Sequence, residues 1–211
     1  MPKQNRVTPF GEIITSPSRG LFMGNRGVLH AQKGVIQRNW KLKAWITCEL
    51  EFKGRKRQIL SPWRYTELFF LDEATALAAG HRPCGECRRE EYKIFKTLWL
   101  QSNREQLTND NPVIAEIDAV IHNQRINRNQ EKVGFKSQLK DIPNGVLIQF
   151  KGEYQTHLVF EGNLCEWSLF GYVSKKPGKS KDEIFVLTPK SIVKTIEMGY
   201  PVKIHPSVNT I

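Results

Sequence analysis

Two cysteines three positions apart, Cys84 and Cys87, are the residues whose spacing points most directly to chemistry. A C-x2-C pair directs two thiolates at one centre, and Zn²⁺ prefers four ligands at the corners of a tetrahedron. Two further ligands must then come from elsewhere in the chain. Cys48 is the natural third ligand. The sequence therefore predicts a zinc site on Cys48, Cys84 and Cys87.

The fourth ligand stays open among three residues. His30 comes first because it lies in the same half of the chain as the three cysteines, followed by Cys165 and then His81. A redox pair at a helix N-terminus, where the helix dipole lowers a thiol pKa, and plain packing are the other uses of a C-x2-C pair. The redox use expects a preceding βαβ strand, whereas a short helix ending at Gly80 is expected here, so a metal is favoured.

A second cluster points to acid–base chemistry. Asp118 and His122 are four residues apart on an expected helix, and Arg125 follows His122 by three, so all three can share one face. A carboxylate that orients an imidazole is the minimum for general base catalysis. We therefore treat Asp118 and His122 as candidate catalytic residues, with an ordinary surface pair as the alternative, and Cys48 as a candidate zinc-activated nucleophile.

The charge of the chain is uneven. The 211 residues carry a formal charge of +11. Residues 1–105 hold 19 Lys and Arg against 10 Asp and Glu, or +9, and 11 of the 13 arginines. Arginine matches phosphate geometry, so clustered arginines are typical of a site for DNA or another polyanion. A solvated basic surface without a partner is the alternative.

Several basic segments of this half are candidates for such contacts. Glycines beside Arg19 and Arg26 can present main-chain N–H groups to a phosphate. The run 55–57 lies close to Trp63, which can stack on a base. Nine residues are expected to contact nucleic acid: Arg19, Arg26, Arg55, Lys56, Arg57, Trp63, Arg64, Arg82 and Arg88.

The elements that must position these residues predict an α+β fold. Alternation over 43–52 and 55–60 predicts a β-hairpin that carries Cys48, and the run 65–70 another short strand. Asp72 is a suitable helix N-cap and Gly80 suits a left-handed C-terminal position, so a two-turn helix is expected between them. The cysteine pair then leads into a helix over 89–100.

The second half of the chain is richer in β-strand signals. A polar stretch over 101–111 is the best linker, and a helix is expected over 112–128. From 142 onward, turns separate short alternating strands, followed by a helix over 188–199 and a strand over 202–205. We therefore expect an Arg-rich zinc-binding region at 1–105, a helical connector at 106–141 and a β-rich domain with one terminal helix at 142–211.

Composition narrows the class of protein. With 39% hydrophobic and 25% charged residues, the chain has the composition of a folded domain rather than a disordered one. No apolar run approaches the roughly 18–20 residues of a membrane helix. The first ten residues lack the apolar core of a signal peptide. We expect a cytoplasmic protein without a membrane partner.

One segment resembles a known family. The run ALAAGHRPCGEC at residues 76–87, with the aromatic strand LFF at 68–70, resembles the zinc module of Ada-type DNA methylphosphotriester repair proteins. In that family four thiolates hold zinc and one of them attacks a methylated DNA phosphate. The resemblance implies that Cys84 and Cys87 are zinc ligands and that Cys48 is the upstream one. Phe52 stands where the family has its other upstream cysteine.

The whole chain is also similar to uncharacterised bacterial proteins that share GNRG, WITC and TELFFLDEATALAAGHRPC. Taken together, these features predict a zinc-binding, DNA-associated protein related to repair or modification. The alternatives are an enzyme that processes nucleic acid or nucleotides through Asp118 and His122 or through Cys48, and a zinc-stabilised module that binds an acidic protein.

Overall fold

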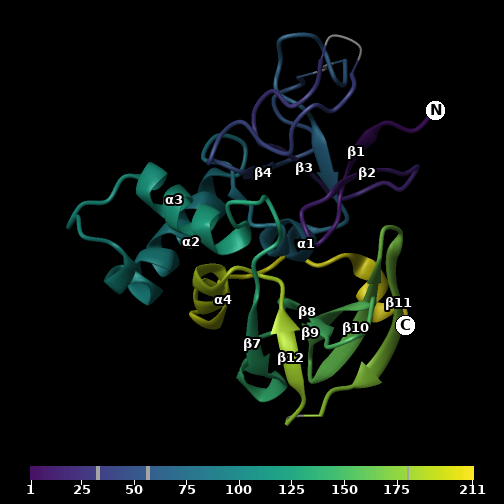
Figure 1. Cartoon of the computed structure of the whole chain (residues 1–211), viewed down its shortest axis with the longest axis vertical. Helices are drawn as coiled ribbons and strands as arrows, with labels where there is room; N and C mark the ends of the chain where they lie inside the picture. Colours follow the sequence, from purple (N-terminus) through teal and green to yellow (C-terminus); the bar gives the residue numbers. More distant parts are fainter. Residues whose placement is uncertain (32–33, 56–57, 180) are drawn as a thin grey trace.

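The computed structural model describes residues 1–31, 34–55, 58–179 and 181–211. Lys56 and Arg57, two of the predicted nucleic-acid contacts, lie outside the described residues. The described part forms two six-stranded sheets and four α-helices (Figure 1). The predicted α+β fold class is confirmed.

The first sheet, in the purple and blue part of Figure 1, is built from the N-terminal residues. Its strand order is β2-β1-β5-β3-β4-β6. The pairs β1–β5 and β4–β6 are parallel and the others antiparallel. Its strands are β1 (Gln4–Val7), β2 (Ile13–Thr15), β3 (Phe22–Asn25), β4 (Ile46–Cys48), β5 (Leu68–Phe70) and β6 (Arg82–Pro83).

The predicted hairpin over 43–60 is wrong. Strand β4, which carries Cys48, lies between β3 and β6 rather than beside a return strand, and no strand is assigned to Arg55 or to 58–60. Lys53 and Gly54, with φ of 52° and 64°, form a turn in which the Arg55 N–H donates to the Phe52 carbonyl at 3.1 Å. The segment after it is not extended, because Leu60 has left-handed backbone with φ of 60° in a second turn at 59–60.

The second sheet, coloured green to yellow in Figure 1, is antiparallel throughout. Its order is β11-β10-β9-β8-β12-β7. The strands are β7 (Phe135–Gln138), β8 (Leu147–Phe150), β9 (Thr156–Phe160), β10 (Asn163–Ser168), β11 (Gly171–Pro177) and β12 (Glu183–Val186). The predicted β-rich texture of this region is confirmed.

The predicted strand over 202–205 is absent. The main-chain N–H of Lys203 donates to Glu73 Oε2 at 3.0 Å, and that of His205 donates to Asp72 Oδ2 at 3.0 Å. These donors serve two carboxylates at the start of a helix instead of a neighbouring strand. A 3₁₀ turn at Pro206–Asn209 follows.

Four α-helices are described, close to the predicted positions: α1 (Glu73–Ala78), α2 (Arg89–Ser102), α3 (Ile114–Arg125) and α4 (Lys190–Glu197). Asp72 caps α1 by accepting from the Thr75 N–H at 2.8 Å, and Gly80 has φ +88°, as predicted. The predicted linker contains the end of α2 and a 3₁₀ turn at Arg104–Gln106.

The largest apolar core gathers side chains from Leu77 to Tyr200. Buried side chains of α2, such as Trp99, pack with Ile117 of α3, Ile192 of α4 and Ile148 of the second sheet. All three regions expected from the sequence therefore contribute to one core, and their boundaries stay a prediction. None of the described helices combines the length and apolarity needed to cross a membrane.

Candidate metal centre

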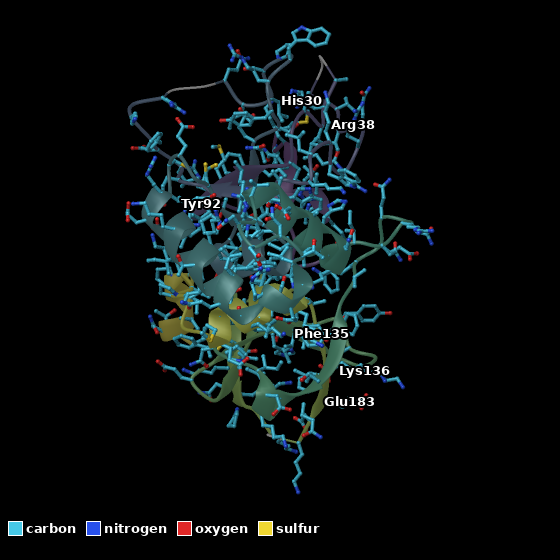
Figure 2. The ribbon with its side chains drawn as sticks, turned by 90° about the vertical axis from the view of Figure 1, so that its left-hand side faces the viewer. His30, Arg38, Tyr92, Phe135, Lys136 and Glu183 are labelled. Carbon is cyan, nitrogen blue, oxygen red and sulfur yellow. The ribbon has the colours of Figure 1, made fainter. Side chains whose placement is uncertain are left out.

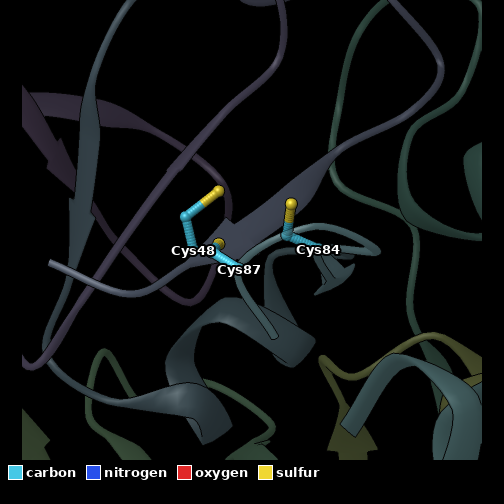
Figure 3. A group of neighbouring side chains, drawn as sticks. All are labelled: Cys48, Cys84 and Cys87. Atoms are coloured by element: carbon cyan, nitrogen blue, oxygen red, sulfur yellow. The ribbon is translucent and has the colours of Figure 1, made fainter. Parts of the chain in front are cut away.

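The side chains of Cys48, Cys84 and Cys87 converge on one point (Figure 3). Their three sulfur atoms lie within 4.8 Å of one another, and none of them is in a disulfide. Three thiolates on one tetrahedral zinc are about 3.8 Å apart, because the Zn–S bond is about 2.3 Å long. The cluster can therefore hold a metal ion, as the sequence predicted.

The sheet brings the third cysteine to the pair. Strand β6 runs parallel to β4, with Thr47 opposite Pro83, and the Cys84 N–H donates to the Thr47 carbonyl at 2.8 Å. Cys48 is the next residue of β4, so it lies beside Cys84. Cys87 then lies two residues before α2, which begins at Arg89.

Arg88 stabilises the position of β4 beside the cysteine pair. Its Nη1 donates to Thr47 Oγ1 at 3.0 Å, and its Nε lies 3.3 Å from Glu49 Oε1, so one guanidinium contacts both neighbours of Cys48. Its Nη2 lies 2.8 Å from Glu73 Oε1 on α1. Because Arg88 is only 1% exposed, its prediction as a nucleic-acid contact is wrong. Charge neutralisation by two glutamates lets it stay buried.

The three thiols also interact with one another. Hydrogen bonds from Cys48 and then Cys87 lower the pKa of Cys84 to about 2, and the same contact with Cys84 raises the pKa of Cys48. Without a cation, the cluster therefore holds one thiolate that the other two thiols stabilise. Three thiolates at this distance require a positive charge between them, which a divalent metal supplies.

A pocket of about 700 Å³ opens beside the cysteines, and all three line it. Its floor is one face of the first sheet: Met23 pairs with both Cys48 and Phe69, so these three side chains lie on the same face. Side chains on the opposite face, such as Thr47 and Leu68, are buried. A metal held by the cysteines would therefore face the pocket.

The walls of the pocket carry residues that were not predicted. Glu67, 3% exposed, belongs to the floor, and Glu51 lies on the segment after Cys48. Phe52, Tyr65 and Phe69 add aromatic rings. The alternation of Glu67 and Phe69 is visible in the sequence, but it points to this pocket only once the pairing of β5 with β3 is known.

His30 is not a ligand of this cluster, so the first choice for the fourth ligand is wrong. The group of described residues with ligand atoms this close contains the three cysteines alone. His30 lies in the upper loop region of Figure 2, where its Nδ1 is 2.7 Å from Thr66 Oγ1 and its Nε2 is 3.1 Å from the Ser61 carbonyl oxygen. Both ring nitrogens therefore already have partners.

The two other choices are also elsewhere. Cys165 is buried in β10 of the second sheet. His81 is fully buried, and its Nε2 accepts a hydrogen bond from Arg26 Nε at 3.2 Å. Within the described part of the chain, the three cysteines line the pocket, and no fourth histidine, cysteine or carboxylate joins their cluster. Closed zinc sites have four protein ligands, whereas reactive ones have three and an open position.

Asp118 and His122 do not form the predicted catalytic pair. Both Asp118 oxygens accept hydrogen bonds from Arg82, which is buried and therefore also unavailable to nucleic acid. His122 Nδ1 instead lies 2.7 Å from Arg125 Nη2. Burial and then the charges of Arg125 and Lys43 lower the pKa of His122 to about 4. Each residue is thus engaged with an arginine.

Arg26 is fully buried as well, so its predicted phosphate contact is wrong. Its guanidinium carbon lies 3.8 Å from the ring centroid of Trp45, and that of Arg125 lies 3.7 Å from it. Two guanidinium groups at this distance collide on one face of a ring, so they occupy opposite faces. Cation–π contact stabilises both charges where carboxylates are scarce.

Four predicted nucleic-acid contacts are exposed: Arg19, Arg55, Trp63 and Arg64. Arg55 forms an ion pair with Glu86, which lies between Cys84 and Cys87 in the turn 84–87, called the knuckle below. Both residues line the pocket. Trp63 and Arg64 lie between Ile59 and Tyr65, which also line it. Arg55 is therefore at the pocket, and Trp63 and Arg64 belong to the segment that joins two of its lining residues.

Comparison with known proteins assigns no family to the chain. No protein-family model matches it, and neither the curated proteins nor the solved structures gave a match. The resemblance to the Ada-type zinc module therefore stays a prediction. The chemistry of the site follows from its own geometry, which is a three-thiolate cluster at the edge of an acidic and aromatic pocket.

Proposed function

We propose that the protein binds Zn²⁺ through Cys48, Cys84 and Cys87 and acts on nucleic acid, in repair or modification. The observation that carries this proposal is the placement of three close sulfur atoms at the wall of an open pocket. Soft thiolate ligands favour Zn²⁺ over Mg²⁺ or Ca²⁺. An open coordination position beside a pocket supports a reactive site rather than a purely structural one.

Fewer residues support nucleic-acid binding than the charge of +11 suggests. Arg26, Arg82 and Arg88 hold the fold together and do not reach solvent. The exposed Trp63 and Arg64, on the segment between the pocket residues Ile59 and Tyr65, would provide stacking and phosphate contact. Nucleic-acid binding is therefore proposed from the exposed residues of this segment and not from the total charge.

A second candidate function is favoured by the exposure of the cysteines to the pocket. Bound zinc would keep Cys48 as a thiolate, which can attack a methyl group on a DNA phosphotriester. An S–C bond forms, the methyl C–O bond breaks, and the electron pair leaves with the phosphate oxygen. Exposure to methylated DNA would then add the mass of one methyl group to Cys48, and unmodified DNA would add none.

The proposal is tested by metal analysis of the purified protein together with replacement of zinc by Co²⁺. One zinc per chain and a sulfur-to-cobalt charge-transfer band of three thiolates are expected. A steep fall of DNA affinity with salt is expected in the same preparation, because phosphate contacts release counterions. A protein purified without metal contradicts zinc binding. A DNA affinity that does not change with salt contradicts the proposed phosphate contacts.

A further inference from the structure

The pocket lining and the segment that joins its residues Ile59 and Tyr65 contain strained backbone. Lys53, Leu60 and Trp63 are non-glycine residues with φ of 52°, 60° and 63°. Such conformations cost on the order of 1 kcal/mol or more, and they are concentrated at functional sites such as ligand clamps. Trp63 is also 82% exposed, although a tryptophan is usually buried to a large extent. This segment is thus shaped for something other than its own packing.

The charges of the pocket lining are mainly negative, with four glutamates against Lys53 and Arg55. Glu67 and Glu51 line the pocket together with the rings of Tyr65 and Phe69. Glu67 accepts the Leu60 N–H at 2.9 Å through Oε2, which fixes its carboxylate. The other two glutamates of the pocket are paired, Glu49 with Arg88 and Glu86 with Arg55.

An exposed basic residue is close to this lining in sequence: Arg64 stands between Trp63 and the lining residue Tyr65. A phosphate is therefore repelled by the carboxylates and thiolates of the lining and attracted to Arg64. A planar ring that carries N–H donors has the opposite preference, because carboxylates accept those donors and aromatic side chains stack on the ring.

Resting on the proposed function, we infer that the pocket takes one unpaired base of a single-stranded nucleic acid, and that this base carries an exocyclic amino group. Carboxylates recognise the amino group of cytosine in the same way in known complexes. Thymine lacks an amino group and offers only acceptors and one imide N–H at its edge. Glu67 is the carboxylate we assign to this recognition.

The neighbouring nucleotide is assigned to Trp63 and Arg64. Trp63 is not part of the pocket wall, so a base inside the pocket does not cover it. The adjacent base of the strand stacks on Trp63, and the phosphate between the two bases contacts Arg64. A duplex fits poorly, because its bases are stacked and their amino groups are already paired.

The test is fluorescence anisotropy of the zinc-loaded protein with fluorescein-labelled hexamers of dC, dA and dT and with a labelled hairpin duplex. The dC and dA strands are expected to bind at least ten-fold more tightly than the dT strand and the hairpin. Unlabelled dCMP, which lacks a second base, is expected to compete more weakly than the dC hexamer. Equal binding of dC and dT strands, or tighter binding of the duplex, overturns the inference.

Variants at Trp63 and at Glu67 test the two proposed contacts separately. Trp63→Ala should weaken all single strands about ten-fold while keeping the preference for dC over dT, and Trp63→Phe should restore part of the affinity. Glu67→Gln should reduce that preference. Glu51→Gln is its exposed companion if the Glu67 variant fails to fold. Phe170→Ala, which removes an exposed ring of the second sheet, is the control and should change nothing.

Zinc content measured on the same samples keeps the two proposals apart. A zinc-loaded protein that binds only duplex contradicts the single-strand inference and leaves the proposed function intact. The same holds if Trp63→Ala leaves the affinity for single strands unchanged. A protein without zinc, or without affinity for any of the four nucleic acids, contradicts the proposed function itself.

Discussion

Arg82 holds Asp118 through both oxygens of the carboxylate, from Nε to Oδ1 at 2.7 Å and from Nη2 to Oδ2 at 2.8 Å. The two side chains are 7% and 5% exposed. This bidentate pair ties β6, two residues before Cys84, to α3. Arg88, on the other side of the knuckle, contacts Thr47 of β4 through Nη1 and Glu73 of α1 through Nη2. The cysteine pair is thus clamped by two buried arginines with different partners.

Replacing these two arginines should therefore have different effects on the metal centre. Arg88→Met should lower metal affinity and weaken the sulfur-to-cobalt band, because Thr47 and Glu49 beside Cys48 lose their anchor. Arg82→Met is the matched control, since each variant leaves a buried carboxylate unpaired at a cost of about 3–5 kcal/mol. Competition with a chelator measures the affinity. Equal affinities in the two variants would show that Arg88 acts through stability alone.

Loss of a cysteine ligand should remove the metal. Cys84→Ser is expected to lose bound zinc and to melt at a lower temperature, because zinc binding supplies on the order of 10 kcal/mol of folding free energy in small zinc modules. Cys165→Ser, a change of the same kind in the buried part of β10, should keep its zinc. Metal analysis and calorimetry give both readings. Full zinc occupancy in Cys84→Ser would remove this residue from the centre.

The cysteine cluster could be predicted because its signals are local or chemically rare. Cys84 and Cys87 are fixed by spacing, and the helix before them by the Asp72 cap and the left-handed Gly80. Cys48 could be predicted as the third ligand because the chain has only four cysteines. These inferences needed no knowledge of which strands pair.

The pocket and the buried arginines required tertiary partners that are distant in sequence. Asp118 lies 36 residues after Arg82, and Trp45 lies between Arg26 and Arg125 although the three residues come from separate segments. A charged side chain normally predicts exposure, so sequence reasoning placed these arginines on the surface. The strand register that brings Glu67 onto the pocket floor is likewise invisible before β3 is known to separate β4 from β5.

Acid should destabilise the protein partly through His122. Its pKa of about 4 in the folded state is below the value near 6.5 of an unfolded histidine. The unfolded chain therefore binds the proton first, so the stabilising contribution is present above pH 6.5 and is lost as the pH falls from 6.5 to 4. His122→Gln should reduce the loss of unfolding free energy between pH 7 and pH 4.5 by about 1 kcal/mol.

Urea titrations of both proteins at the two pH values measure this difference. Comparing the variant with the parent chain cancels the protonation of the cysteines, which is common to both. An identical acid-induced loss in the two proteins would mean that His122 has the same pKa in the folded and unfolded states and contributes no pH dependence.

Gly80 joins the end of α1 to the knuckle in a conformation that a side chain cannot share. A Cβ at this position would lie 2.4 Å from Arg125 Cδ and 2.8 Å from Arg125 Cβ. Gly80→Ala must therefore displace Arg125, which donates to the Gly80 carbonyl at 2.8 Å and covers one face of Trp45. We expect a loss of about 3 kcal/mol or more of unfolding free energy.

Gly152→Ala isolates the backbone part of that cost. Gly152 has φ +82°, close to the +88° of Gly80, but a Cβ there has no atom within 4 Å. Its substitution should cost only about 1 kcal/mol, the strain of a left-handed alanine. Denaturant unfolding of both variants measures the two losses. Because Gly80 precedes the metal ligands by four residues, only its variant should also bind zinc more weakly, whereas equal losses and equal zinc affinities would show that the Arg125 contact does not shape the knuckle.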